Sequence, residues 1–427
     1  HRTPARPICN PPRMLSILDG LLPGYHPFVE SGLSSGIVAL SALVILSDTP
    51  VIETPSGEVV LDVGFVEAMK LHCQLWPGRV RGVVWRGTAP AAQAMRYSPE
   101  RLGFDLVALD AGAPLPPLLL DESGLIYCSA DDARHLHLGE AMRHRLGRLV
   151  LSLETTPLER LTQALTQKPY RSWPAATFAV LRHEVALRRA LRHADGLHLR
   201  ALGAEFGYRW FNREVLVCTA SRLRLPMLAR SAERAARAER LRSGAPLRLA
   251  CCEPLERASG AGDLLPLAQI LRAQGMDFTL EIIGEGSMAG RLRDGIAGLA
   301  LGAQVSLRPP MGFESALVPH LRQNVDLMLM PNRAPAAGLR AIEAMGCGVP
   351  VLAYTSPSWR WVSALSGGGW ACRRGPGPMA RQIRALDTGR EVLIAASRAA
   401  LSFARGHTFE AGFMNRMAHL RAIAGLE

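Results

Sequence analysis

The chain has 427 residues, of which 48 % are hydrophobic and 20 % charged, so it can fill the cores of two domains and is neither disordered nor fibrous. Its formal charge of +12 comes almost entirely from arginines spread along the whole length, and only 6 % of its residues are aromatic. Basic blocks and stacking platforms are therefore lacking, and we expect no nucleic-acid partner.

The first part of the chain alternates buried apolar runs with helical stretches. Residues 1–35, rich in proline at their start, are set aside as a tail, and residues 36–221 form the expected N-terminal domain. The predicted strands are Ile37–Leu46, Val80–Trp85, Leu106–Leu109, Leu125–Cys128 and Leu149–Leu153. The predicted helices are Phe65–Leu75, Leu136–Leu146 and Thr177–Leu191. Such alternation is typical of a parallel sheet covered by helices on both faces.

A second alternating block follows an Arg- and Glu-rich connection at residues 222–246, which we expect to be partly helical. The block at 247–404 is the expected C-terminal domain, and residues 405–427 end in a helix at Phe409–Ile423. Its predicted strands are Arg248–Cys252, Phe278–Ile283, Val305–Leu307 and Val325–Met330. Its predicted helices are Asp263–Ala273, Leu292–Leu299, Ala316–Gln323 and Ala380–Leu386. The pattern predicts a second Rossmann-like α/β domain.

The cysteines and the apolar runs bear on where the protein works. The eight cysteines show no Cys-x-x-Cys pair and no paired Cys/His spacing, so we expect reduced thiols and no zinc site. No run reaches the roughly 18 apolar residues of a membrane span. We therefore expect a cytoplasmic protein, with its basic face able to rest on the inner, anionic surface of a membrane.

The segment from Gly338 to Ala353 carries the clearest chemical signal. Leu339, Ile342 and Met345 recur at helical spacing, and a glycine then separates the helix from a compact apolar strand. A helix N-terminus supplies unpaired N–H groups for an anion, and Glu343 one turn later can hold a hydroxyl. A site for both a phosphate and a ribose would bind a nucleotide. The alternative interpretation of this segment is a core helix with a solvated glutamate.

This segment resembles the donor-nucleotide motif of retaining glycosyltransferases of the family 4 group, which have the GT-B fold of two Rossmann-like domains facing a cleft. The Gly-Leu pair at Gly338 and Leu339, Glu343 with Ala-Met, the Cys-Gly pair and the Val-Pro-Val strand all match. The family's first glutamate, which contacts the transferred sugar, is replaced here by Pro335. The resemblance implies that Glu343 holds the ribose, that the C-terminal domain binds the donor and that the last helix crosses back to the acceptor domain.

Two further segments extend the resemblance. Gly284-Glu285-Gly286 after a strand matches the family's Gly-x-Gly turn beside the donor nucleotide, although such a triplet alone is also a common tight turn. In the loop leading to Asp-Leu-Leu at residues 263–265, the family's arginine and lysine for the donor diphosphate are replaced by Pro254 and Ser259. Besides Ser259, the side chains that could contact the diphosphate instead are Arg257, Arg308 and Arg333, each of which is otherwise a surface arginine.

The resemblance implies a retaining, metal-independent hexosyltransferase that uses a UDP- or GDP-linked sugar and needs no cofactor. The acceptor would be a saccharide or lipid-linked molecule, as in bacterial surface polysaccharide synthesis. The alternative is a GT-B protein that has lost turnover and serves as a binding or assembly partner, as the three replacements suggest. Asp48, after the first strand, is an acceptor-side candidate, and the catalytic residues stay unassigned. The family often has a histidine near the reaction centre, for which His72, His135, His137 and His183 are all candidates.

Overall fold

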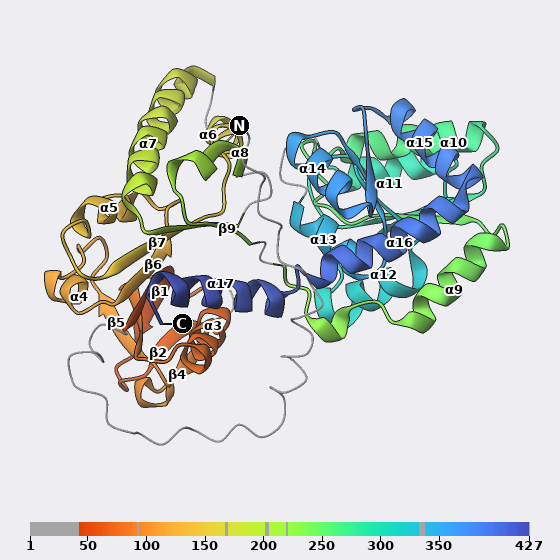
Figure 1. The fold of residues 1–427 in the computed structure, drawn as a ribbon. Coiled ribbons are helices and arrows are strands. Elements are labelled where there is room, and N and C mark those ends of the chain that lie inside the picture. Colours follow the sequence, from red (N-terminus) through yellow and green to blue (C-terminus); the bar gives the residue numbers. More distant parts are fainter. Residues whose placement is uncertain are drawn as a thin grey trace, which may run out of the picture.

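The chain folds into two lobes, each built on one sheet with helices on both faces (Figure 1). The computed structural model describes residues 42–91, 94–166, 170–200, 205–218, 221–332 and 338–426. The predicted tail and the first residues of the predicted strand at Ile37 lie outside these ranges. The limits predicted for the domains remain a proposal, and the sheets are described here by their strands.

The sheet of the first lobe has nine strands, most of them parallel. They are β1 (Leu43–Glu53), β2 (Val59–Asp62), β3 (Val80–Arg86), β4 (Ala94–Tyr97), β5 (Asp105–Leu109), β6 (Leu125–Ser129), β7 (Arg148–Leu153), β8 (Gly196–Leu199) and β9 (Val215–Val217). The parallel order is β5-β3-β1-β6-β7-β8-β9, and β2 and β4 add an antiparallel corner next to β1. Four of the five predicted strands are present with a shift of one residue at one end. The strand predicted at Ile37–Leu46 was wrong at its end, since β1 continues to Glu53.

The helices of the first lobe cover both faces of this sheet. They are α3 (Val63–Leu75), α4 (Pro117–Asp121), α5 (Leu138–Ala141), α6 (Pro157–Thr166), α7 (Trp173–His193) and α8 (Glu205–Tyr208). The helix predicted at Leu136–Leu146 is wrong in length, since only α5 forms there. The chain leaves the helix in a tight turn, in which the Arg145 N–H donates to the Met142 carbonyl, so that it can enter β7.

The sheet of the second lobe is parallel throughout, in the order β12-β11-β10-β13-β14-β15. Its strands are β10 (Leu247–Cys251), β11 (Phe278–Ile283), β12 (Val305–Arg308), β13 (Leu327–Met330), β14 (Val351–Tyr354) and β15 (Gly369–Cys372). The direction of chain progression reverses between β10 and β13. In open α/β sheets, ligands bind outside the carboxyl ends of the strands at such a switch point.

Helices on the two faces of this sheet enclose separate apolar cores. One face carries α10 (Leu264–Ala273), α11 (Ala289–Gly298) and α15 (Pro376–Thr388). The other carries α12 (Val318–Asn324), α13 (Gly338–Gly346), α14 (Pro357–Ser366) and α16 (Arg390–Arg405). In Figure 1, α13 and α14 lie on the side of the second lobe that is turned towards the first.

The segments before and after the second lobe in the sequence each contain a helix. The segment predicted as a connection contains α9 (Ser231–Arg242), which packs against α12 and α16 of the second lobe. The buried Arg237 of α9 donates to the carbonyl groups of Leu321, Arg322, Cys347 and Gly348. The last helix, α17 (Phe409–Ile423), runs back along the first lobe, where its Phe413, Met417 and Leu420 join the core beside β1 (Figure 1).

Candidate functional site

The residues singled out in the second lobe gather around the switch point of its sheet. The loop after β10 leads to α10, the turn after β11 contains Gly284 and Gly286, and the connection after β13 enters α13. All three leave the same edge of a parallel sheet, so they lie next to one another. The apolar positions of α13 are buried against the sheet, which fixes how the helix presents its first turn.

Glu343 is the most constrained charged group in this region. Its side chain is only 8 % exposed, and its two oxygens accept hydrogen bonds from Nε and Nη2 of Arg222 at 3.0 and 3.1 Å. The guanidinium of Arg222 also lies over the Phe313 ring, 4.2 Å from its centre. A buried carboxylate held by one bidentate cation keeps further lone pairs for hydroxyl donors. Arg222 was not found by sequence reasoning, because 121 residues separate it from Glu343.

The Gly284-Glu285-Gly286 turn packs tightly against the loop after β10. A Cβ atom at Gly284 would lie 2.4 Å from the carbonyl oxygen of Glu253, and one at Gly286 would lie 2.6 Å from that of Leu255. The Glu285 carbonyl in turn accepts the Leu255 N–H at 2.8 Å, while the Glu285 side chain is exposed. Close approach of two loops therefore explains both glycines, and this contact places the turn at the edge of the switch point.

Several of the side chains expected near a diphosphate form hydrogen bonds or ion pairs with other protein groups. Arg308 pairs with Glu281 at 2.8 Å, and the Ser259 hydroxyl donates to carbonyl groups of its own loop. Arg333 and Pro335 lie outside the described residues, whereas Pro254 is exposed beside Glu253. Gly338 and the half-exposed Leu339 begin α13, so the N-terminal end of that helix is accessible.

A pair that sequence reasoning missed stands at the first turn of α13. Arg340 donates to the Cys252 carbonyl at 3.0 Å and to Oε2 of Glu253 at 2.9 Å. Glu253 is 7 % exposed, and burial raises the pKa of its carboxyl group against the pull of Arg340. The available signals were an acidic residue directly after a buried strand and an arginine next to Leu339. This pair puts one cation and one buried carboxylate beside the helix N-terminus.

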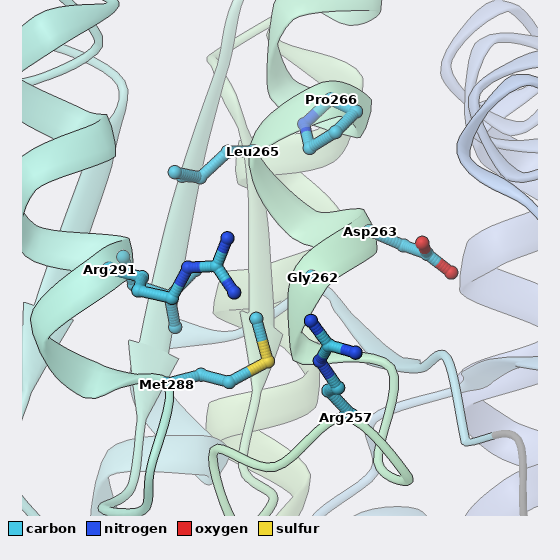
Figure 2. A pocket seen from close by; sticks show the side chains of 8 residues that line it. Arg257, Gly262, Asp263, Leu265, Pro266, Met288 and Arg291 are labelled. Atoms are coloured by element: carbon cyan, nitrogen blue, oxygen red, sulfur yellow. The ribbon is translucent and has the colours of Figure 1, made fainter.

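Arg257 contributes to a cavity of about 420 Å³ between α10 and α11. The cavity is also lined by Met288 and Arg291 of the neighbouring segment and by Asp263 at the start of α10. Figure 2 shows the guanidinium groups of Arg257 and Arg291 pointing towards the same space, with Met288 close to both. The Asp263 carboxylate accepts the Tyr354 hydroxyl at 2.9 Å. Two arginines at one cavity make it attractive to an anion.

In the first lobe, the structure brings Asp48 together with one of the histidine candidates, His135. Asp48 lies within β1, just beyond the part that pairs with β6, and not after the strand as expected, because β1 continues to Glu53. His135 follows β6, together with Asp132 and Arg134. Arg134 bridges the two carboxylates, at 3.0 Å from Asp48 and 2.6 Å from Asp132. Burial and the neighbouring Asp132 raise the pKa of Asp48. Although burial opposes ionisation of Asp132, hydrogen bonds from Arg134 lower its pKa to about 2.

The other histidine candidates have different surroundings. His72 of α3 is buried against the Phe413 ring of α17, at 4.8 Å between ring centres. His137 is exposed, directly before α5. His183 of α7 lines a second cavity, of about 360 Å³, with Asp131 and Arg160, and burial lowers its pKa. Only His135 joins Asp48 in one cluster among the described residues.

Two findings bear on the expectations about compartment. In the described part of the chain no helix is both long and apolar enough to cross a bilayer. The seven cysteines that the structure describes are all free thiols, most of them buried, while Cys9 lies outside the described ranges.

Comparisons with known proteins agree with the fold and with the donor-side resemblance. Residues 235–387 match the family model of glycosyl transferases group 1. HepE from Anabaena, solved in complex with UDP, is similar over 90 % of this chain and 100 % of its own, with 15 % identity and a TM-score of 0.60. Sucrose-phosphate synthase from Thermosynechococcus elongatus is similar over 91 % of this chain and 100 % of its own, with 14 % identity and a TM-score of 0.60.

A third structure, that of WaaG, described as a glycosyltransferase involved in lipopolysaccharide biosynthesis, covers 90 % of this chain and 100 % of its own at 13 % identity and a TM-score of 0.51. Curated proteins gave no match to the sequence. Likeness at such low identity establishes the fold, and the family model covers the lobe that contains Glu343. The chain therefore has the GT-B fold, and residues 235–387 in its second lobe resemble the glycosyl transferases of group 1.

Proposed function

We propose that the protein transfers a hexose from a nucleotide diphosphate sugar to a saccharide or lipid-linked acceptor, with retention of configuration at the anomeric carbon. The observation that carries this proposal is the buried Glu343 carboxylate beside the switch point, held by Arg222 and one helical turn from an accessible helix N-terminus. A carboxylate there suits the ribose hydroxyls, and the helix end suits the diphosphate. Because HepE was solved with UDP and with UDP-glucose, a uridine nucleotide is the first donor to test.

The leaving diphosphate would be stabilised without a metal ion at the donor site. The N-terminal amides of α13 near Gly338 and Leu339 face the place where negative charge develops, and Arg340 adds a cation in the same turn. As the bond from the anomeric carbon to the phosphate oxygen breaks, the acceptor oxygen bonds to the same face of the sugar. The proton of that hydroxyl passes to an oxygen of the departing β-phosphate, so no protein base is required.

The experiment has a binding part and a turnover part. UDP and GDP are titrated into the protein by calorimetry, and the hydrolysis of a panel of nucleotide sugars is then followed. Binding that Glu343→Ala weakens, together with turnover of at least one donor, supports the proposal. A protein that binds neither nucleotide contradicts it.

A second candidate function is favoured by one specific observation, the buried Glu253 next to Arg340. The Glu253 carboxylate would repel a diphosphate bound here. It also pairs with Arg340, the cation that would otherwise neutralise the diphosphate. Together with Pro254, Ser259 and Pro335, it favours a GT-B protein that binds a nucleotide or a partner without turnover. Nucleotide binding without turnover of any donor would favour this function. Restored turnover in Glu253→Gly would show that Glu253 is what suppresses it.

Support for membrane contact comes from α7, which contains the basic helix predicted at Thr177–Leu191. Its Phe178, Leu181 and Val185 are 69 %, 58 % and 70 % exposed and recur on one helical face. Exposed Arg182 and Arg189 flank this face, so it fits an anionic lipid surface. The protein would then work at the inner face of a membrane, in surface polysaccharide assembly, the setting that WaaG's description names for that protein. Binding to anionic vesicles that is unchanged in a Phe178→Ser, Leu181→Ser double variant contradicts this part of the proposal.

A further inference from the structure

We infer that the first lobe carries a binding site for a divalent transition-metal ion, with Asp48, Asp132 and His135 as its ligands. One potential ligand atom from each residue lies within 4.8 Å of the others. Asp48 lies in β1 just beyond its pairing with β6, and Asp132 and His135 follow β6, so the fold itself brings them together. Carboxylate oxygens and an imidazole nitrogen are ligands that zinc, cobalt and manganese accept.

His135 provides the observation that points to an ion rather than to a simple acidic cluster. Its side chain is 1 % exposed, and its Nδ1 lies 2.8 Å from the Ser129 carbonyl oxygen. Donation from Nδ1 leaves the lone pair of Nε2 free, and Nε2 lies 4.0 Å from Oδ2 of Asp132 with no hydrogen-bond partner. Metal-binding histidines are oriented in this way by a backbone carbonyl on the other nitrogen. A bound ion would satisfy a buried nitrogen that the protein leaves unsatisfied.

The two carboxylates supply the rest of the site. Arg134 bonds to Oδ1 of Asp48 and to both oxygens of Asp132, yet each carboxylate oxygen has two lone pairs, so both groups keep positions for an ion. The two carboxylates outnumber the one guanidinium bonded to them, so a cation would offset the remaining negative charge. Asp48 is 53 % exposed, so water can complete the coordination from that side.

An ion at this place would fasten two segments that lie at the carboxyl edge of the first lobe. The pairing of β1 with β3 shifts between Leu46 and Pro50, directly around Asp48, and the 3-10 turn at Ala133–His135 has only three residues. This site lies in the first lobe and Glu343 in the second, so the ion would not contribute to binding of the donor diphosphate at α13. Its presence does not conflict with a donor site that uses helix amides and arginine.

The test measures metal binding rather than glycosyl transfer. Protein treated with a chelator and dialysed is titrated with Co²⁺, whose visible absorption bands report coordination, and Zn²⁺ is then added to displace it. We expect one equivalent of Co²⁺ to bind. Asp132→Asn and His135→Gln should each weaken binding by at least about 100-fold, whereas His137→Gln, a histidine outside the cluster, should not change it.

Circular dichroism and calorimetric UDP binding in the second lobe verify that each variant is folded. If Asp132→Asn proves unstable, His135→Gln with the His137→Gln control carries the test by itself. Absence of stoichiometric Co²⁺ binding to the wild-type protein would overturn the inference. Binding that survives in a folded His135→Gln protein would overturn it as well, because the ion would then lie elsewhere.

Discussion

The Glu343→Gln variant tests whether this buried carboxylate recognises ribose. The substitution keeps the shape of the side chain and removes its charge, so charge-assisted hydrogen bonds become neutral ones. A hydrogen bond to a charged group contributes roughly 1.5–3 kcal/mol and a neutral one roughly 0.5–1.5 kcal/mol, so the substitution should cost roughly 1–1.5 kcal/mol. The Kd for UDP should therefore rise by roughly 5- to 12-fold. Because Arg222 is 64 % exposed, its guanidinium can return to water when its partner is neutralised, so the fold should be little affected.

The assay is a thermodynamic cycle made with calorimetry. UDP and 2′,3′-dideoxy-UDP are titrated into the wild-type protein and into Glu343→Gln. If Glu343 binds the ribose hydroxyls, the wild-type protein prefers UDP by roughly 10- to 150-fold, and this preference is smaller by roughly 5- to 12-fold in the variant. Glu391→Gln, at an exposed carboxylate on α16, serves as the matched control and should bind both ligands like the wild type.

The result that refutes this reasoning is a loss that is equal for the two nucleotides. Equal loss would mean that Glu343 supports the lobe in general, through Arg222, rather than contacting the sugar hydroxyls. Unchanged UDP affinity in the variant would remove Glu343 from the nucleotide site altogether.

Three further predictions concern stability. Burial lowers the pKa of His72 from 6.5 to about 4, so between these pH values the unfolded chain binds a proton that the folded chain does not. This difference should lower the free energy of unfolding by about 3 kcal/mol between pH 6.5 and pH 4. Denaturant titrations should show that His72→Phe flattens this pH dependence. Arg237→Met removes the guanidinium donor from four backbone carbonyls, of which only that of Gly348 keeps a side-chain donor, the Ser397 hydroxyl, among the described residues. The free energy of unfolding in urea should fall by about 3–5 kcal/mol, against less than about 1 kcal/mol for the surface pair lost in Arg242→Met. Gly284→Ala brings a Cβ atom too close to a carbonyl oxygen and should lower both the Tm and the affinity for UDP. In the control Gly290→Ala the added Cβ meets nothing within 4 Å, so neither quantity should fall. An unchanged Tm in Gly284→Ala would contradict the packing of the turn.

Many regular elements could be predicted because their signals are local. The strand at Phe278–Ile283 and the helix at Phe409–Ile423 begin and end where the apolar pattern does. The antiparallel corner formed by β2 and β4 was missed, since each strand has only four residues and too few alternations to stand out. The helix predicted at Leu136–Leu146 was too long, because apolar spacing does not reveal where a turn must fit before the next strand.

The site could be predicted only as far as its local motifs reach. Gly338, Leu339 and Glu343 belong to one continuous segment, so a single motif indicates them. Their partners come from distant parts of the chain: Arg222 reaches Glu343 from the segment between the lobes, and Glu253 reaches Arg340 from the loop after β10. Such contacts depend on strand order and helix placement, which one sequence does not specify by residue type.

The most direct measurement of the central claim is a crystal structure of the protein with UDP. Our account predicts the ribose hydroxyls on the Glu343 carboxylate, with Arg222 still bonded to it, and the diphosphate at the N-terminal end of α13 beside Arg340. UDP bound away from Glu343, for example in the cavity between Arg257 and Arg291, would contradict the account.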